Sequence, residues 1–270
     1  MIRLALVQMD SRDDVRANLR KAEGFIREAK AGGAELVAFP EFMNFLPFSR
    51  RDLYFEGADG PTTTLLQELA RELDLVIHAG SILLDSGEKR PYNHSFLVDR
   101  DGRIKGRYSK LHLFDASLSE GVSFRESELY LPGNEIVTAD IFGITAGMAI
   151  CYDFRFPEPF RIMTKAGARI IFVPGSFTRS TGLTHLMPVL KTRAIENEVF
   201  IISADQTGRK KKTESFGHSM VIAPDGTVAA VKEEGEGLLF YDLDISLVDR
   251  QRQRLPLLMH AREDVYARYR

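Results

Sequence analysis

Apolar runs typical of strands alternate along this chain with segments of helical periodicity, and the same order occurs twice. This alternation indicates crossover units, in which helices cover the faces of a largely parallel sheet. The expected strands are 2–8, 35–39, 75–82, 94–99 and 103–108 in the first half, and 136–141, 143–150, 169–174, 199–204, 217–223, 227–232 and 237–242 in the second. The expected helices are 13–31, 61–73, 157–166 and 184–197.

Two pairs of short segments support the repeat. "HSFLVDRDG" at 94–102 and "HSMVIAPDG" at 218–226 both place His-Ser seven residues before an Asp-Gly hairpin turn. "VAFPEF" at 37–42 and "IFVPGSF" at 171–177 both contain a Pro where an apolar strand ends. Two such halves would pack sheet against sheet with their helices outside. The sequence therefore predicts an α/β fold, a four-layer α-β-β-α sandwich of two pseudo-repeated halves, as a single domain over 1–270.

The overall charge argues against two classes of partner. A formal net charge of -2 at pH 7 gives no electrostatic basis for binding nucleic acid or an anionic membrane surface. The run "GRKKKTES" at 208–215 is the one cluster of basic residues, and we expect it to be a solvated loop. The apolar run Leu4–Met9 is too short for a signal-peptide core or a membrane span, so it predicts a first strand.

Cys151 is the only cysteine of the 270 residues, so no internal disulfide can form. No other residues surround it in a metal-ligand spacing. A chain without disulfides is typical of a reducing compartment, which predicts cytoplasmic localisation.

Three ionisable residues follow predicted strands. Glu41 comes after "ELVAFP", Lys110 after "IKGRYS" and Cys151 after "GITAGMAI". Active groups of open α/β sheets gather beyond the carboxyl ends of strands. Together the three side chains could supply a nucleophile, a base and a cation for a developing oxyanion, which is the set that acyl transfer needs.

Histidine is the usual base beside a cysteine nucleophile, so the histidines are alternatives to Glu41. His112 lies two residues after Lys110, and strand parity would put it on the same face. His94 and His218 belong to the repeated hairpin pattern, which favours a structural hydrogen-bonding role. These residues leave the choice between a Glu and a His base open.

Three segments resemble the signature segments of the nitrilase superfamily of carbon–nitrogen hydrolases. They are "FPEF" around Glu41, "YSKLHLFD" around Lys110 and "GMAICYDFRFPE" around Cys151. The similarity continues through "SFRESELYLPG", "VPGSF", "TRAIENEVF" and "FGHSMVIAPDG", so it covers nearly the whole chain, and "KLHLFD" and "FRES" are most similar to the Nit-type branch of ω-amidases and deaminated-glutathione amidases. The resemblance implies the sandwich fold, a homodimer or higher homo-oligomer, and chemistry without a metal or organic cofactor.

The resemblance also implies roles for individual residues. Glu41, Lys110 and Cys151 would form the catalytic triad, and Glu126 in "FRES" would be a second glutamate in the same pocket. Cys151 would attack the amide carbon while Lys110 and the backbone N–H of Tyr152 hold the oxyanion. Glu41 would then pass its proton to the departing ammonia and activate the water that cleaves the thioester.

The chain departs from the Nit-type pattern after "STG". Leu186 and Met187 stand where these enzymes typically have Trp and Glu, and the chain contains no Trp. Arg179, in "SFTRSTG", is a candidate clamp for a substrate carboxylate, because arginine binds carboxylates through two hydrogen bonds. Tyr152 and Phe177 are candidate pocket walls.

We therefore expect a hydrolase that cleaves a small linear amide, such as an ω-amide that bears a carboxylate, through a thioester on Cys151. The alternatives are N-carbamoyl or nitrile hydrolysis on the same scaffold, or a binding protein without turnover. The C-terminal segment at about 244–270 is expected to pack on a dimer partner.

Overall fold

We describe a computed structural model of the chain, which covers residues 1–47, 53–117, 123–210 and 214–269. Its first sheet contains seven strands, six of them in a row and the seventh, β6, paired beside β5. In spatial order the row is β17 (Gly237–Leu243), β1 (Ile2–Gln8), β2 (Leu36–Ala38), β3 (Val76–His78), β5 (Tyr92–Val98) and β4 (Ile82–Leu84), and β6 is Ile104–Ser109. Strands β1, β2 and β3 are parallel, as a crossover unit requires.

The second sheet contains six strands and also has a parallel centre. Its order is β16 (Val228–Lys232), β15 (Ser219–Ile222), β12 (Phe200–Ser203), β11 (Ala168–Phe172), β10 (Ile144–Met148) and β9 (Thr138–Ile141). Strands β10, β11 and β12 run parallel to one another. Two short hairpins complete the strands, β7 (Asp115–Ser117) with β8 (Ser123–Arg125) and β13 (Thr207–Arg209) with β14 (Glu214–Phe216).

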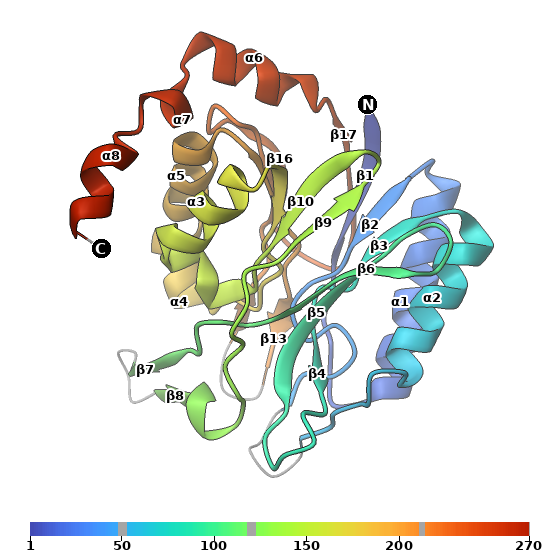
Figure 1. Cartoon of the computed structure of the whole chain (residues 1–270). Coiled ribbons are helices and arrows are strands. Elements are labelled where there is room, and N and C mark those ends of the chain that lie inside the picture. The colour runs from blue at the N-terminus through green and yellow to red at the C-terminus, as the bar shows by residue number, and fades with distance from the viewer. Residues whose placement is uncertain (48–52, 118–122, 211–213, 270) are drawn as a thin grey trace.

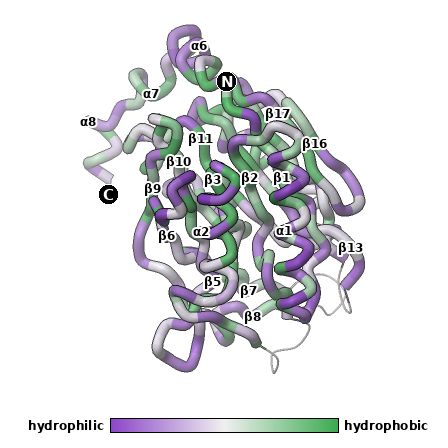
Figure 2. The backbone as a smooth tube through the Cα atoms, turned by 90° about the vertical axis from the view of Figure 1, so that its right-hand side faces the viewer, coloured by the Kyte–Doolittle hydropathy of each residue, from purple (hydrophilic) through white to green (hydrophobic). Residues whose placement is uncertain are grey.

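The two sheets pack face to face between two layers of helices, which confirms the predicted four-layer sandwich (Figure 1). One buried cluster joins Leu4 and Leu36 of the first sheet to Ile170 and Phe172 of the second. The outer helices are α1 (Val15–Ala31) and α2 (Pro61–Leu73) on the first sheet, and α3 (Pro157–Lys165) and α5 (Met187–Asn197) on the second. Figure 2 shows the matching pattern, with hydrophobic colour along the central strands and mixed colour along α1 and α2.

The helices begin at residues that satisfy their free amides. The side chain of Asp14 accepts a hydrogen bond from the backbone N of Ala17 at the start of α1. At the start of α2, Pro61 occupies the first turn and buried Glu56 accepts the N–H of Thr62 at 2.8 Å. The first two predicted helices therefore form close to their expected bounds.

The predicted division of strands between the halves is wrong for the last one. Strand β17 leaves the second half and pairs antiparallel with β1, with Ile2 opposite Leu243 and Gln8 opposite Gly237. The apolar strand pattern at 237–242 identified the strand correctly. It could not identify the partner, because alternation carries no information on which sheet edge a strand joins.

Two other predicted elements are divided in the structure. The strand expected at 75–82 is two strands, β3 and β4, separated at Gly80, whose φ is +65°. A Cβ atom at Gly80 would lie 2.0 Å from the carbonyl oxygen of Pro40, so only glycine fits this close approach. The helix expected at 184–197 starts as α4 (Arg179–Thr181) and a π turn (Gly182–Leu186) before α5.

The basic run 208–215 is not simply a solvated loop. Its first two residues belong to β13, its last two belong to β14, and Lys210 is buried. Residues 211–213 of the run lie outside the described part of the chain.

The C-terminal segment contains α6 (Ser246–Arg254), α7 (Leu257–His260) and α8 (Glu263–Tyr266), which lie along the side of the molecule that carries α3 and α5 (Figure 1). Val248 is fully buried, and Arg252 donates to the carbonyl oxygen of Ala168 at 3.0 Å. The segment therefore contacts its own second sheet through α6. Within the described residues, no helix combines the length and apolar character needed to cross a membrane.

Candidate active site

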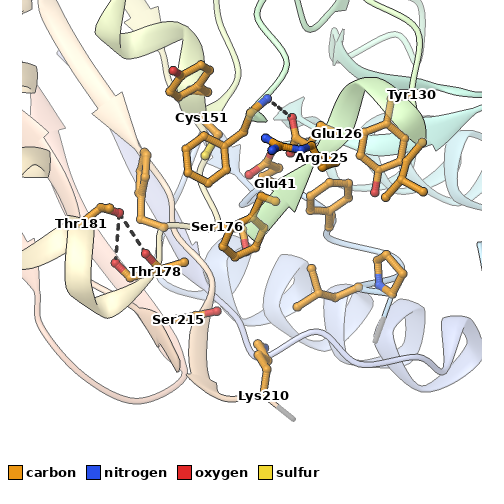
Figure 3. A pocket seen from close by; sticks show the side chains of 18 of the residues that line it. Glu41, Arg125, Glu126, Tyr130, Cys151, Ser176, Thr178, Thr181, Lys210 and Ser215 are labelled. Atoms are coloured by element: carbon orange, nitrogen blue, oxygen red, sulfur yellow. Dashed lines mark hydrogen bonds between the residues drawn. The ribbon is translucent and has the colours of Figure 1, made fainter. Parts of the chain in front are cut away.

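A cavity of about 330 Å³ opens beyond the ends of the central strands, and both halves of the chain line it. The first half and the central connection contribute mainly apolar and aromatic side chains, together with Glu41, Arg125 and Glu126. The second half contributes Cys151 with its following turn and a polar group that includes Ser176, Thr178, Lys210 and Ser215 (Figure 3). The full set is Glu41, Phe42, Leu46, Pro47, Leu53, Phe114, Ser123, Phe124, Arg125, Glu126, Leu129, Tyr130, Cys151, Tyr152, Phe154, Arg155, Ser176, Phe177, Thr178, Thr181, Lys210, Glu214 and Ser215.

Glu41 follows β2 in a turn that both halves of the chain hold in place. Its side chain is buried, and Oε1 accepts a hydrogen bond from Nδ2 of Asn93 at 2.8 Å. Its backbone oxygen accepts another from Nε2 of Gln206 at 2.9 Å. The next residue, Phe42, has a φ of +58°, so the chain turns sharply after Glu41. The carboxylate therefore has one orientation toward the cavity.

Lys110 follows β6 and its ammonium group joins two carboxylates. The Nζ atom lies 3.0 Å from Oε1 of Glu41, and 2.9 Å and 3.1 Å from the two carboxylate oxygens of Glu126. The side chain has no exposed surface, and Lys110 is not among the residues that line the cavity. Burial alone would lower the pKa of Lys110, but the charges of Glu126 and Glu41 outweigh burial and hold it well above its ordinary value.

Glu126 begins a short 3-10 turn, Glu126–Glu128, directly after β8. Its Oε2 accepts the backbone N–H of Phe114 at 2.8 Å, in addition to its contacts with Lys110. Burial raises the pKa of Glu126, Lys110 opposes that shift, and Glu41 adds to it. Two carboxylates thus share one cation in a buried site, and the three groups together carry a net charge of −1 when all are ionised.

Cys151 lies at the end of strand β10, where the chain enters the 3-10 turn Cys151–Arg155. Its φ is +45°, a left-handed conformation that costs a residue other than glycine roughly 1–3 kcal/mol. Its N–H donates to the carbonyl oxygen of Pro174 at 2.9 Å, which anchors the strained residue to the segment after β11. The strained turn presents the thiol to the same cavity as Glu41.

The surroundings of Cys151 do not favour a free thiolate. Burial raises the pKa of Cys151 well above its ordinary value, and Glu41 raises it further, while Lys110 acts in the opposite direction. Loss of the thiol proton to water would bring the local charge from −1 to −2. Transfer of that proton to Glu41 would leave the summed charge of Glu41, Glu126, Lys110 and Cys151 unchanged, so it would cost less than loss of the proton to water.

The other predicted site residues are divided between the cavity and its outside. Tyr152 and Phe177 line it, and Tyr152 packs against Phe114 with ring centroids 4.9 Å apart. Arg179 does not line it, because the side chain is half-exposed and lies 3.5 Å from Glu214. The geometry thus gives no support to Arg179 as a carboxylate clamp.

No histidine is among the described residues that line the cavity. Nδ1 of His112 lies 2.8 Å from Oδ1 of buried Asp153, and its ring stacks on Phe156 at 3.7 Å. The expected shared face with Lys110 does not arise, because β6 ends at Ser109 and the chain turns. His94 and His218 do make hydrogen bonds, to Ser109 Oγ at 2.9 Å and to the carbonyl oxygen of Phe216 at 3.0 Å.

Three residues that the sequence reasoning missed support the site. Asn93 orients Glu41 with its side chain, and its backbone oxygen accepts the N–H of Lys110 at 2.9 Å. Asp153 accepts from Tyr108 Oη at 2.6 Å, from Ile150 N at 2.9 Å and from His112 N at 3.0 Å, so it ties the Lys110 segment to the Cys151 turn. Lys210 lines the cavity. Only the position of Asp153 beside Cys151 offered a signal in the sequence.

The two departures from the Nit-type pattern lie away from the cavity lining. Leu186 is buried in the core under the second sheet, and Met187 is 37% exposed. Among the described residues, no group of three or more His, Cys, Asp and Glu side chains could hold a metal ion.

Comparison with protein families shows that residues 3–253 match the carbon-nitrogen hydrolase family. Among curated proteins, the chain is 33% identical to omega-amidase NIT2 of Homo sapiens, over 98% of this chain and 96% of that protein. It is 36% identical to deaminated glutathione amidase of Synechocystis, over 95% of this chain and 96% of the relative.

Solved structures show the same similarity in three dimensions. Nit3 of Saccharomyces cerevisiae, described as a member of branch 10 of the nitrilase superfamily, superposes with a TM-score of 0.85 at 30% identity. The match covers 95% of this chain and 94% of that one. The similarity therefore extends over the whole sandwich rather than over one motif.

Proposed function

This chain belongs to the carbon–nitrogen hydrolase family and is an amidase of the nitrilase superfamily, and from its cavity we propose that it cleaves a small linear amide through a thioester on Cys151, with release of ammonia. One observation carries the proposal. The ammonium of Lys110 lies within 3.0 Å of Glu41 and 2.9 Å of Glu126, and both carboxylates line the cavity that Cys151 enters.

In the first step Glu41 accepts the thiol proton as the sulfur of Cys151 attacks the amide carbon. The carbonyl oxygen becomes an oxyanion, and Lys110 and the backbone N–H of Tyr152 stabilise it. The ammonium group of Lys110 has three N–H donors, and one oxygen of Glu41 and both oxygens of Glu126 accept from it. The longest of these bonds, to Oε1 of Glu126 at 3.1 Å, is the one that would be exchanged for a bond to the oxyanion. The amide of Tyr152 lies in the first turn of a 3-10 helix, where amides have no partner inside the helix.

Collapse of this intermediate breaks the C–N bond, and the proton on Glu41 passes to the leaving nitrogen as ammonia departs. Glu41, again a carboxylate, then removes a proton from water as the water attacks the thioester. The carboxylic acid product leaves and the proton returns to sulfur. Glu126 remains ionised beside Lys110 throughout and keeps the ammonium group in place.

We further propose that the enzyme is cytoplasmic and forms a homodimer or a larger homo-oligomer. The lone thiol of Cys151, which has no disulfide partner, supports a reducing compartment. Exposed apolar side chains of the C-terminal segment, among them Leu255, Met259 and Tyr266, support packing of 244–270 on a second copy. Sedimentation of the full chain and of a chain shortened before Leu255 would test the assembly.

The test of the reaction is ammonia release across three panels of substrates: ω-amides, N-carbamoyl amino acids and nitriles. The proposal expects turnover of ω-amides and trapping of an acyl group on Cys151, detected by mass spectrometry after acid quench. Turnover limited to carbamoyl compounds or nitriles would assign a different reaction to the same cavity. Ammonia release that survives Cys151→Ala would contradict the thioester.

A further inference from the structure

The two ends of the cavity differ in their charged groups. The end beside Cys151 has the carboxylates of Glu41 and Glu126, which share buried Lys110, and the cations Arg125 and Arg155 also line the cavity there. Lys210 lines the opposite end, well separated from Cys151 (Figure 3). Lys210 attracts an anionic group of a substrate to this second end.

The far cation belongs to a built site rather than to a mobile surface side chain. Lys210 is 8% exposed, and its Nζ donates to a carboxylate oxygen of Asp10 and to the carbonyl oxygen of Ser11. Asp10 also pairs with Arg12, so the two cations and one carboxylate sum to a charge of +1. Burial lowers the pKa of Lys210, with smaller contributions from Arg12 and Lys21, and the hydrogen bond and charge of Asp10 oppose that shift.

The ammonium of Lys210 has donor capacity left for a ligand. Asp10 and Ser11 account for two of its three N–H groups within the described part of the chain. Its only acidic neighbour in the cavity lining at this end, among the described residues, is Glu214, which pairs with Arg179. A ligand oxygen that enters the cavity could therefore complete the coordination of Lys210.

We propose that Lys210 binds a carboxylate that the substrate carries at its end remote from the scissile amide. The inference rests on the proposed function and defines its substrate class as elongated ω-amides of carboxylic acids. The cavity lining includes Phe42, Leu129 and Tyr130, which suits a substrate with an apolar chain between amide and carboxylate. A carboxylate held by Lys210 leaves the amide, at the other end of the substrate, to reach Cys151.

Two other cations, Arg125 and Arg155, line the cavity closer to Cys151 than Lys210 does. Arg155 belongs to the same turn as Cys151, and its guanidinium lies over the rings of Tyr152 and Phe154, at 5.8 Å and 4.8 Å from their centroids. Arg125 is exposed to solvent and lines the cavity beside Glu41 and Glu126 (Figure 3). Contacts from Arg155 or Arg125 would act on groups close to the amide, whereas contacts from Lys210 would act only on long substrates.

The test compares Lys210→Met with the unaltered enzyme on straight-chain dicarboxylic acid monoamides of increasing length and on their methyl esters, which lack the charge. For the longer acids we expect KM to rise by about tenfold or more, the range for loss of a charged hydrogen bond. For the esters and for the shortest acid, KM should change by less than about twofold. Lys210→Arg should keep the preference for long acids, because the positive charge of the side chain, rather than its packing, would bind the substrate carboxylate.

Arg209→Met is the matched control. Arg209 precedes Lys210, is exposed and does not line the cavity, so this variant removes the same charge without touching the site. It should leave the preference for long acids unchanged.

A second readout does not depend on turnover. Straight-chain dicarboxylates should protect Cys151 from alkylation by iodoacetamide better than monocarboxylates of equal length do, and Lys210→Met should abolish the difference. Protection without amidase activity would refute the proposed reaction and retain the carboxylate site. The role of Lys210 would be overturned if Lys210→Met raised KM equally for the acids and their esters. It would also be overturned if this variant kept the preference for long acids.

Discussion

Replacement of Lys110 by Met would test whether the cation stabilises the site or takes part in the reaction. Methionine is similar in length and shape but removes the charge from between Glu41 and Glu126, which lie 3.0 Å and 2.9 Å from Nζ. The local charge changes from −1 to −2. Burial already raises the pKa of Glu126, and the charge of Lys110 is the main influence that lowers it. Without this cation, the pKa of Glu126 should therefore rise further.

The expected cost follows from the burial of these groups. Removal of one partner from a buried ion pair destabilises a protein by about 3–5 kcal/mol. Uptake of a proton by the carboxylate pair removes one of the two negative charges. We therefore expect Lys110→Met to lower the free energy of unfolding at pH 7 by about 3 kcal/mol, the low end of this range. A carboxyl group whose pKa is raised in the folded state binds more protons folded than unfolded. The stability of Lys110→Met should therefore be greatest at low pH and fall as the pH rises toward 8.

The double variant Lys110→Met with Glu126→Gln separates the two roles. It restores the local charge of −1, so urea unfolding at pH 6 and pH 8 should show most of the lost stability recovered. The rate at saturating substrate should stay about 100- to 1,000-fold below that of the unaltered enzyme, because the oxyanion donor is still missing. Recovery of turnover in the double variant would refute the reasoning, since Lys110 would then only balance charge.

Three further predictions follow from the site and the core. Cys151→Ala should leave the fold intact and retain less than about a hundredth of the turnover. Glu41→Gln should make Cys151 unreactive toward iodoacetamide at neutral pH, and unchanged thiol reactivity together with substantial turnover would reject Glu41 as the base. Burial lowers the pKa of His78 to about 3 and, with Arg107, that of His94 to about 4. The stability that these two neutral histidines contribute is therefore complete above pH 6.5 and is lost as the pH falls, by about 1.4 kcal/mol each at pH 5.5. Between pH 7 and pH 5.5, a His94→Gln variant should lose less of its free energy of unfolding than the unaltered protein does, as measured by urea unfolding.

The predictable parts of the site were those that local sequence determines. Glu41, Lys110 and Cys151 each follow a predicted strand, and active groups of open α/β sheets gather beyond the carboxyl ends of strands. The meeting of the three at one point also depends on the packing of the two sheets, because β2 and β6 belong to the first sheet and β10 to the second. Asn93 and Lys210 could not be identified in the same way, because polar residues of these types occur throughout a chain and their roles depend on partners that are remote in sequence.

Backbone conformation sets a similar limit on prediction. The positive φ of Cys151 arises from anchoring to Pro174, and no propensity of cysteine indicates it. The four-layer sandwich was predictable because the hydrophobic period identifies each layer. The edge pairing of β17 was not, because it depends on which exposed strand edge is free once the sheets have formed.

The pairing of β1 with β17 has a consequence for how the chain acquires its fold. Ile2 is synthesised long before its partner Leu243. Until then β1 has an open edge, which is the kind of surface that recruits strands from other chains. Contacts this remote in sequence also slow folding, because a long loop must close before they form. We therefore expect the first sheet to close, and its tendency to aggregate to end, only after β17 has been synthesised.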